Sequence, residues 1–229
     1  MFDVWGPECV AFTSNDTEAL NIALQGTLHP EEGTIHVICT EMDHNSVLRP
    51  LYRLEKKGMN LTILPVDRKG RISLTELEAA IRPETKVIVC THASNLTGNL
   101  NDIHAIGEIA QKHQKLFIVD AAQTAGVFPI SMKKDHIDIL CFSGHKGLMG
   151  PQGTGAICVR PGVSVEPLKV GGSGVLTFQR EHPQDMPETL EAGTEQPRDR
   201  RSWRSYQLDY RNRNRTDPKK RAAADVAFL

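Results

Sequence analysis

The sequence lacks long hydrophobic runs and closely spaced cysteine pairs. No apolar stretch approaches the roughly eighteen residues of a membrane span, and the first residues have neither the basic nor the hydrophobic region of a secretory signal. We therefore expect a cytoplasmic protein without a membrane contact. The five cysteines form no CxxC pair, and Cys39, Cys90, Cys141 and Cys158 lie in or beside apolar stretches. We expect them to be small buried hydrophobes rather than disulfides, metal ligands or nucleophiles.

Net charge is also nearly absent, but the charges are unevenly distributed. The 229-residue chain has a formal net charge of −1, with the 39% hydrophobic and 24% charged residues of a soluble globular protein. Residues 195–229 contain ten lysines and arginines against five acidic residues, whereas residues 1–194 contain 17 against 23. The sequence therefore predicts one large acidic domain, residues 1–194, followed by a basic tail of different composition.

Short apolar runs rich in β-branched residues recur along the acidic part. They are TIHVICT (34–40), LTILPV (61–66), KVIVCT (86–91), KLFIVD (115–120), IDILCFS (137–143) and GAICVR (155–160). Segments with helical apolar spacing lie between several of them, around residues 74–81 and 103–110. This alternation predicts an α/β fold with a mixed, mostly parallel sheet that helices cover on both faces.

Polar residues close three of these runs, at the sheet edge where such folds bind ligands. They are residues 92–95, Asp120 with Gln123, and residues 143–146. The segment FTSNDTEALNIAL begins a further helix, with Asn15 as its N-cap and Glu18 as the capping-box partner. The backbone N–H groups of Asp16 and Thr17 are then expected to point outwards as an anion site.

Lys146 follows the apolar run 139–143, where a buried strand is expected to leave the core. A deprotonated lysine can form an imine with an aldehyde, and the aldehyde that enzymes most often hold in this way is pyridoxal phosphate. This cofactor needs a carboxylate against its ring nitrogen, which Asp120 can supply, and a donor to its phenolic oxygen, which Gln123 can supply. Phosphate donors and an imidazole face are also needed, and the candidates are Thr17, Ser143, His145 and His44.

These residues also have simpler explanations. A strand-end lysine is more often a solvated loop residue, and a strand-end aspartate such as Asp120 is often a helix N-cap. Most of the other histidines fit surface or structural roles, and only His92, close to the candidate site in sequence, stays a further candidate. The glycine-rich GPQGTG (150–155) lacks the Gly-Lys-Ser/Thr ending of a P-loop, so we interpret it as a sharp turn.

Six motifs occur in the order and at the spacing of a known family, from about Ala11 to Thr194. They are TSNDTEALN, EMDHNSVLRPL, THASNLTGN, VDAAQTAG, FSGHKGLMGPQGTG and EAGT. In these motifs the chain resembles the cysteine desulfurases and their relatives in the class V aminotransferase group. The resemblance implies the large domain of a pyridoxal-phosphate enzyme of the aspartate-aminotransferase-like fold, a homodimer that releases sulfur from L-cysteine and leaves L-alanine.

The resemblance also implies a role for each motif residue. Lys146 would bind the cofactor aldehyde and move the substrate proton, and His44 would stack on the ring. Asp120 and Gln123 would contact the ring nitrogen and the phenolic oxygen. The other cofactor-binding residues that it implies are Asp16, Thr17, Asn95, Ser143, His145 and Thr194, the last of which would reach the phosphate bound by the neighbouring subunit.

Asp16 departs from the family pattern, in which this position is usually a small neutral residue. A carboxylate here is expected to lie close to the dianionic phosphate and to weaken cofactor binding. A helix N-terminus favours negative charge by about 0.3–1 kcal/mol, which would offset part of that cost. The sequence therefore predicts that Asp16→Ala binds the cofactor more tightly.

The basic tail, residues 195–229, loses the apolar periodicity and is dominated by arginine. One interpretation is a disordered arm for nucleic acid, because Trp203, Tyr206 and Tyr210 lie among the arginines. We favour another. Plausible codons read one nucleotide later spell a helix-like sequence whose opening resembles the segment after EAGT in the family. The tail is therefore hypothesised to be a non-native, irregular frameshift product, and nucleic acid is not an expected partner.

The resemblance implies further parts that this sequence does not contain. In the family, residues before the first motif and a small C-terminal domain complete the substrate site, and the C-terminal domain carries the cysteine that takes up the sulfur. We therefore expect a large domain that is incomplete at its N-terminus and impaired in turnover. The alternatives are a selenocysteine lyase, another class V aminotransferase or β-lyase, and an inactive fragment that only binds the cofactor. A sulfur-acceptor protein is a candidate partner of the intact parent.

Overall fold

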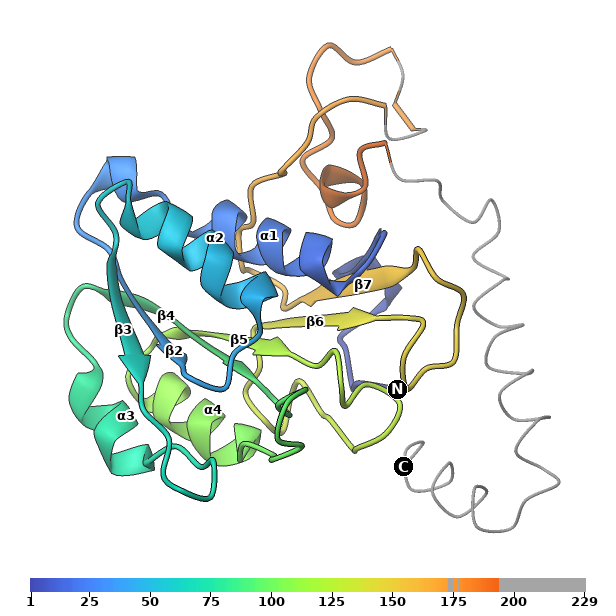
Figure 1. Ribbon diagram of the computed structural model, residues 1–229. Helices are drawn as coiled ribbons and strands as arrows, with labels where there is room; N and C mark the ends of the chain where they lie inside the picture. The colour runs from blue at the N-terminus through green and yellow to red at the C-terminus, as the bar shows by residue number, and fades with distance from the viewer. Residues whose placement is uncertain (173–174, 177, 194–229) are drawn as a thin grey trace, which may run out of the picture.

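The computed structural model describes residues 1–172, 175–176 and 178–193, which build a seven-stranded sheet (Figure 1). Its order across the sheet is β1-β7-β6-β5-β4-β2-β3. The strands are β1 (Val10–Thr13), β2 (His36–Thr40), β3 (Asn60–Leu64), β4 (Thr85–Thr91), β5 (Leu116–Asp120), β6 (Ile139–Ser143) and β7 (Gly155–Val159). Among these strands, β7 runs opposite to the rest: it pairs antiparallel with β1 and β6, and the other pairings are parallel. The predicted basic tail and Thr194 lie outside the described residues.

Helices cover both faces of the sheet. α1 (Asp16–Thr27) and α2 (Asn45–Glu55) pack on one face, and α3 (Leu74–Ala80) and α4 (Ile103–Lys112) pack on the other (Figure 1). Three short 3₁₀ helices complete the order of elements: η1 (Pro7–Cys9), η2 (Pro30–Glu32) and η3 (Glu188–Leu190). The predicted mostly parallel sheet between two helical layers is confirmed.

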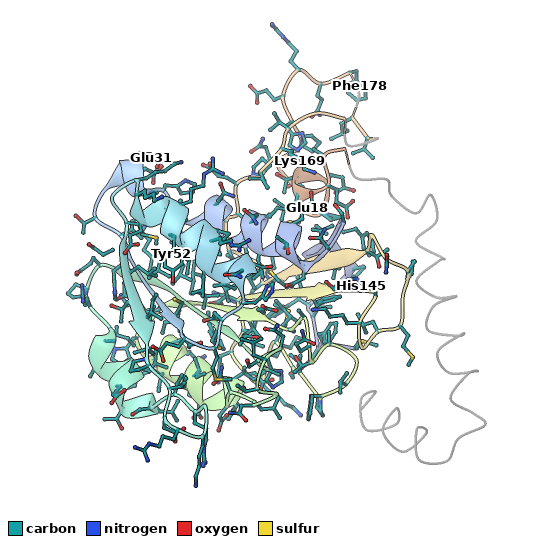
Figure 2. The ribbon with its side chains drawn as sticks, in the orientation of Figure 1. Glu18, Glu31, Tyr52, His145, Lys169 and Phe178 are labelled. Carbon is teal, nitrogen blue, oxygen red and sulfur yellow. The ribbon has the colours of Figure 1, made fainter. Side chains whose placement is uncertain are left out.

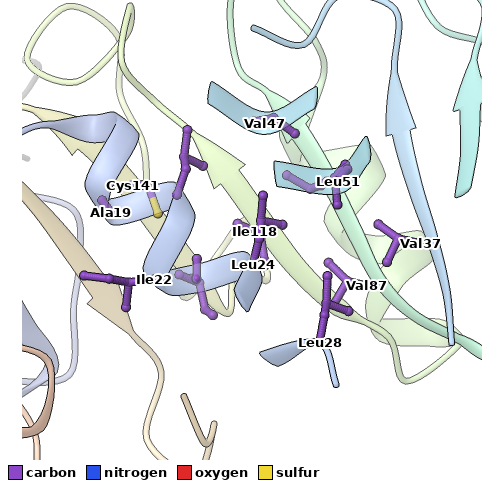
Figure 3. Close-up of a cluster of buried hydrophobic side chains, with 14 of the residues drawn as sticks. Ala19, Ile22, Leu24, Leu28, Val37, Val47, Leu51, Val87, Ile118 and Cys141 are labelled. Atoms are coloured by element: carbon purple, nitrogen blue, oxygen red, sulfur yellow. The ribbon is translucent and has the colours of Figure 1, made fainter. Parts of the chain in front are cut away.

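The two hydrophobic cores follow from the two-residue period of the strands. Val87 and Ile118 belong to the cluster under α1 and α2, part of which is shown in Figure 3. Their sequence neighbours Ile88 and Phe117 belong to the cluster under α3 and α4. Since both faces are covered, the central strands are continuous apolar runs, which is why six of the seven strands can be recognised in the sequence.

β1 and α2 are not evident in the sequence pattern. β1 is only four residues long, and α2 contains Pro50, which lacks a backbone N–H and is ordinarily a helix breaker. α2 nevertheless forms because it buries an apolar face with Val47, Leu51 and Leu54 against the first core. Tertiary packing therefore outweighs the local preference in this segment.

The start of α1 forms at the predicted N-cap. The Asn15 side chain accepts a hydrogen bond from the Glu18 N–H at 2.9 Å. The Glu18 carboxylate accepts from the Ser14 N–H at 2.7 Å, one residue before its predicted partner, and it pairs with Lys169 at 2.6 Å (Figure 2). A Cβ atom at Gly155 of β7 would lie 2.6 Å from the Asn15 carbonyl carbon, so only glycine allows α1 to begin this close to the sheet.

All five cysteines are free and buried, in agreement with the prediction that they act as small hydrophobes. Burial raises the pKa values of Cys90 and Cys141, which disfavours the thiolate form. Within the described residues, no helix is long and apolar enough to cross a membrane, and no cluster of His, Cys, Asp and Glu could hold a metal ion.

The packing of α2 predicts the effect of two neighbouring substitutions. Leu51 is 0% exposed and Tyr52 is 41% exposed. Leu51→Ala should lower the free energy of unfolding by about 2–5 kcal/mol, since it removes buried methyl groups and leaves a cavity. Tyr52→Ala should change it by about 0.5 kcal/mol or less. Urea unfolding of both variants tests this difference, and equal losses would contradict the burial of the Leu51 face.

Candidate active site

The parallel strands bring the predicted site residues to one edge of the sheet. Asp120 is the last residue of β5 and Ser143 is the last residue of the neighbouring β6. His44 follows β2 as the N-cap of α2, and Lys146 follows β6 in a loop. Because these strands run in the same direction, their carboxyl ends lie at a common edge, where ligands bind in such folds.

Asp120 is the most deeply buried charged group of this edge. It is 2% exposed, and its Oδ1 accepts a hydrogen bond from the Ala122 N–H at 2.8 Å. Burial raises the pKa of Asp120, whereas this hydrogen bond and the nearby Lys146 and His44 act in the opposite direction. The residues after Asp120 form turns rather than a helix, so the alternative of a helix N-cap does not describe Asp120.

Hydroxyl groups connect the starts of α1 and α2. The Oγ atoms of Thr17 and Ser46 lie 2.7 Å apart, and His44 Nδ1 lies 2.9 Å from the same Ser46 Oγ. The Asp16 N–H donates to Ser143 Oγ at 3.2 Å, so it does not point outwards as the sequence predicts. Ser46 was not among the predicted residues, although it stands two positions after His44 in the same motif.

The remaining predicted residues lie on the turns beyond the strands. Gln123 is half-buried on the turn after β5, and Asn95, His145 and Lys146 are exposed on the loops after β4 and β6. Figure 2 shows His145 beyond the end of β6. A Cβ atom on Gly147 would lie 2.5 Å from the carbonyl oxygen of residue 125. The turn with Gln123 therefore packs directly against the loop with Lys146.

The side chain of Asp16 is buried at the start of α1. It is 5% exposed and lies close enough to Asp120 for the two carboxyl groups to influence each other's pKa. Burial and the charge of Asp120 raise the pKa of Asp16 well above its ordinary value. Its Oδ1 is buried without a hydrogen-bond partner among the described residues.

Asp43 is a buried carboxylate that the sequence prediction missed. Its Oδ2 accepts from the N–H and the hydroxyl of Thr40 at 2.7 and 2.9 Å, and its Oδ1 accepts from the Thr91 N–H at 2.6 Å. Burial raises the pKa of Asp43 to about 7, although these hydrogen bonds act in the opposite direction. Asp43 joins the ends of β2 and β4 and stands next to His44, so it holds this part of the edge together.

His92 lies behind Asp120. Its backbone N–H donates to the Asp120 carbonyl at 2.8 Å, and its ring packs edge-on to Phe128 with the centroids 6.3 Å apart. Burial lowers the pKa of His92, and its Nδ1 has no partner among the described residues. The neutral ring therefore packs behind the site. This agrees with the structural role that the sequence analysis gives for most of the other histidines.

These groups fit the chemistry of pyridoxal phosphate. A buried carboxylate, Asp120, ends one strand, and an amine, Lys146, follows the next strand close enough to influence the pKa of that carboxylate. Hydroxyls of Thr17 and Ser143 stand at the start of α1, where anions are favoured. The buried, unpartnered Asp16 Oδ1 adds a polar atom that the described residues leave unsatisfied.

The fold and this edge define a class of pyridoxal-phosphate-dependent enzymes, with a doubly covered sheet and a lysine and an aspartate at adjacent strand ends. Residues 3–200 match the model of the class V aminotransferase family, and the chain belongs to this family. Members of this family depend on pyridoxal phosphate, the cofactor that the sequence predicts.

Similar proteins include cysteine desulfurases. The chain is 39% identical to the putative cysteine desulfurase IscS 1 of Bacillus subtilis over 164 residues. This match covers 71% of this chain and 43% of the relative. The chain is 41% identical over 166 residues to cysteine desulfurase IscS of Methanosarcina thermophila, covering 72% and 41%. The chain thus spans less than half the length of these relatives.

Solved structures of similar proteins share the fold of this chain. The apo cysteine desulfurase of Thermococcus onnurineus matches with a TM-score of 0.74 and 35% identity, covering 81% of this chain and 48% of the other. SspA in complex with cysteine matches with a TM-score of 0.71 and 32% identity, covering 81% and 53%. The cysteine desulfurase CsdA of Escherichia coli matches with a TM-score of 0.77 and 26% identity, covering 84% and 49%.

The contacts of Asp43 predict a loss of stability in Asp43→Asn. The amide has one oxygen and one NH₂ group, so at least one of the Thr40 and Thr91 N–H groups loses its acceptor. We expect the free energy of unfolding to fall by about 1–3 kcal/mol. The exposed control Glu31→Gln should change it by about 0.5 kcal/mol or less. Chemical denaturation measures both, and an unchanged stability of Asp43→Asn would contradict the bridging role.

Proposed function

We propose that this chain supplies the pyridoxal-phosphate-binding part of an enzyme of the cysteine desulfurase type, which releases sulfur from L-cysteine and leaves L-alanine. The observation that carries the proposal is the position of buried Asp120 at the end of β5, next to Lys146 just beyond the neighbouring β6. The names of the relatives and the cysteine complex of SspA support the substrate.

The bound cofactor would withdraw electrons from the substrate carbon most strongly when its ring nitrogen is protonated. Asp120 would hold that proton in place as a carboxylate, and Gln123 would donate to the phenolic oxygen. Lys146 would hold the aldehyde and afterwards move a proton at the substrate carbon. His44 would lie on the ring face, and Asn95 would lie beside the cofactor and the substrate.

The phosphate would be held by hydroxyl and imidazole groups around the start of α1. Both Thr17 and Ser143 lie at this point: the Thr17 hydroxyl contacts Ser46 Oγ, and Ser143 Oγ accepts from the Asp16 N–H. His145, two residues beyond Ser143, would add a further donor. Thr194 is proposed to reach the phosphate bound by the neighbouring subunit.

A homodimer would account for apolar side chains exposed at this edge. Leu96, Val127, Phe128 and Met149 are exposed on the loops after β4, β5 and β6. A second copy of the chain would cover them, as the family leads one to expect. Sedimentation of the cofactor-loaded chain should give a dimer, and a monomer at all concentrations would contradict this part of the proposal.

A cytoplasmic location and a sulfur-acceptor protein are proposed on the family resemblance alone.

We also propose that residues 1–194 are the cofactor-binding domain and that the basic tail is a frameshift product. The change in composition at residue 195 supports this division. Sequencing the gene tests it, because the shifted reading frame should encode the family-like continuation. An unrelated sequence in that frame would contradict the proposal.

Reductive trapping tests the role of Lys146. Borohydride added to the chain with one equivalent of pyridoxal phosphate should fix one pyridoxyl group on the peptide that contains Lys146, as peptide mass spectrometry would detect. Lys146→Ala should lose this label, whereas the exposed control Lys57→Ala should keep it. Label spread evenly over many lysines would contradict a specific site.

Product analysis tests the proposed substrate. L-cysteine added to the loaded chain with excess thiol, which accepts the released sulfur as a persulfide, should change the cofactor absorbance and slowly yield alanine. Asp120→Ala should slow alanine formation by about 10²–10⁴-fold, the usual contribution of a group that controls a proton. Alanine formed from L-selenocysteine but not from L-cysteine would indicate the selenocysteine lyase instead. An absorbance change without alanine would indicate a chain that only binds the cofactor.

A further inference from the structure

Two carboxyl groups from distant parts of the sequence meet inside the candidate site. Asp16 begins α1 and Asp120 ends β5, and their carboxyl groups lie close enough that each influences the pKa of the other. Both residues are almost completely buried. A hydrogen bond between two carboxyl groups requires a proton on one of them, since two carboxylates have no donor and repel each other.

The groups around the pair can balance one negative charge more readily than two. Lys146 from the loop after β6 and His44 from the start of α2 are the basic groups that act on the pair among the described residues. The other titratable groups facing it are uncharged thiols or acidic: Cys141 on β6, Cys90 on β4 and Asp43 after β2. The surroundings therefore favour a pair that keeps one proton.

The contacts indicate which member of the pair carries the proton. Asp120 accepts the Ala122 N–H, and both Lys146 and His44 stabilise its charged form. Asp16 Oδ1 has no donor among the described residues, and the charge of Asp120 disfavours ionisation of Asp16. An ionised carboxylate is favoured where donors and cations meet it, which is the situation of Asp120 and not of Asp16.

We propose that Asp16 carries the shared proton and donates it to Asp120, as a positioning residue that keeps Asp120 ionised and oriented. The part of this role that concerns the pyridine ring nitrogen rests on the proposed function. The proton sharing itself does not. A neutral Asp16 adds no charge near the phosphate, so the weaker cofactor binding expected from the sequence is replaced by the opposite expectation: Asp16 strengthens binding.

The shared proton predicts that the folded chain loses stability as the pH rises. The folded chain holds the proton of Asp16 more tightly than the unfolded chain does, because its pKa is raised on folding. The resulting stability is fully present below the ordinary aspartate pKa and is lost as the pH rises through the raised value. Asp16→Asn keeps a donor to Asp120 but cannot titrate. The stability of the wild type relative to Asp16→Asn should therefore fall steadily as the pH rises.

Infrared spectroscopy of the full chain without cofactor tests the shared proton. The spectrum of the wild type minus that of Asp16→Asn at neutral pH should show the C=O band of a protonated carboxylic acid, and the difference with Asp16→Ala should show the same band. The control Asp67→Asn should give no such band, because Asp67 is exposed and hydrogen bonds from Lys69 and Arg71 lower its pKa. Circular dichroism verifies that each variant is folded. A missing acid band in both Asp16 differences would overturn the proposal.

Titration with pyridoxal phosphate tests the positioning role. Asp16→Asn should bind within about threefold of the wild type, whereas Asp16→Ala should bind about tenfold or more weakly, since it loses a hydrogen bond to a charged group. The affinity of the wild type should fall at high pH more steeply than that of Asp16→Asn. Tighter binding by Asp16→Ala would overturn the positioning role. If none of the proteins binds the cofactor, the proposed function fails, and the infrared result still decides the proton sharing.

Discussion

The buried carboxylate of Asp120 is the constraint on which the edge of the sheet depends. An ionised group with 2% exposure is costly unless donors and opposite charges surround it. The Ala122 N–H, Asp16, Lys146 and His44 all act on it, and they come from four different segments. The same arrangement that makes the burial tolerable also places an amine and an imidazole around one carboxylate, which is the chemistry of the proposed site.

The direction of the strands decides where these groups can meet. Every strand except β7 among the described ones ends at the same edge, and β5 and β6 are neighbours. The ends of β2 and β4 would otherwise present unsatisfied backbone groups, and Asp43 accepts from Thr40 and Thr91 at that point. Gly155 lets the start of α1 approach the sheet, which brings Asp16 over the end of β6. The contacts that satisfy these backbone groups thus also bring the residues of the candidate site together.

Many strands and several site positions could be predicted from the sequence, because they depend on residues close to each other in the chain. Six strands are continuous apolar runs, and the N-cap at Asn15 is a short-range pattern of side chain and backbone. The ends of β5 and β6 at Asp120 and Ser143 follow from where each apolar run stops. α2 could not be predicted in this way, since Pro50 contradicts its local helical preference and only the burial of its apolar face restores it.

The sequence by itself determined the class of fold, the strand ends and the family to which the chain belongs, because periodicity and motif order are properties of neighbouring residues. Tertiary structure alone decided the partner of Asp16. The local pattern placed its carboxylate at a helix start facing an anion, whereas the path of α1 over the sheet buries it against Asp120. Burial and a distant like charge control the proton on such a group, and neither is written in the residues beside it.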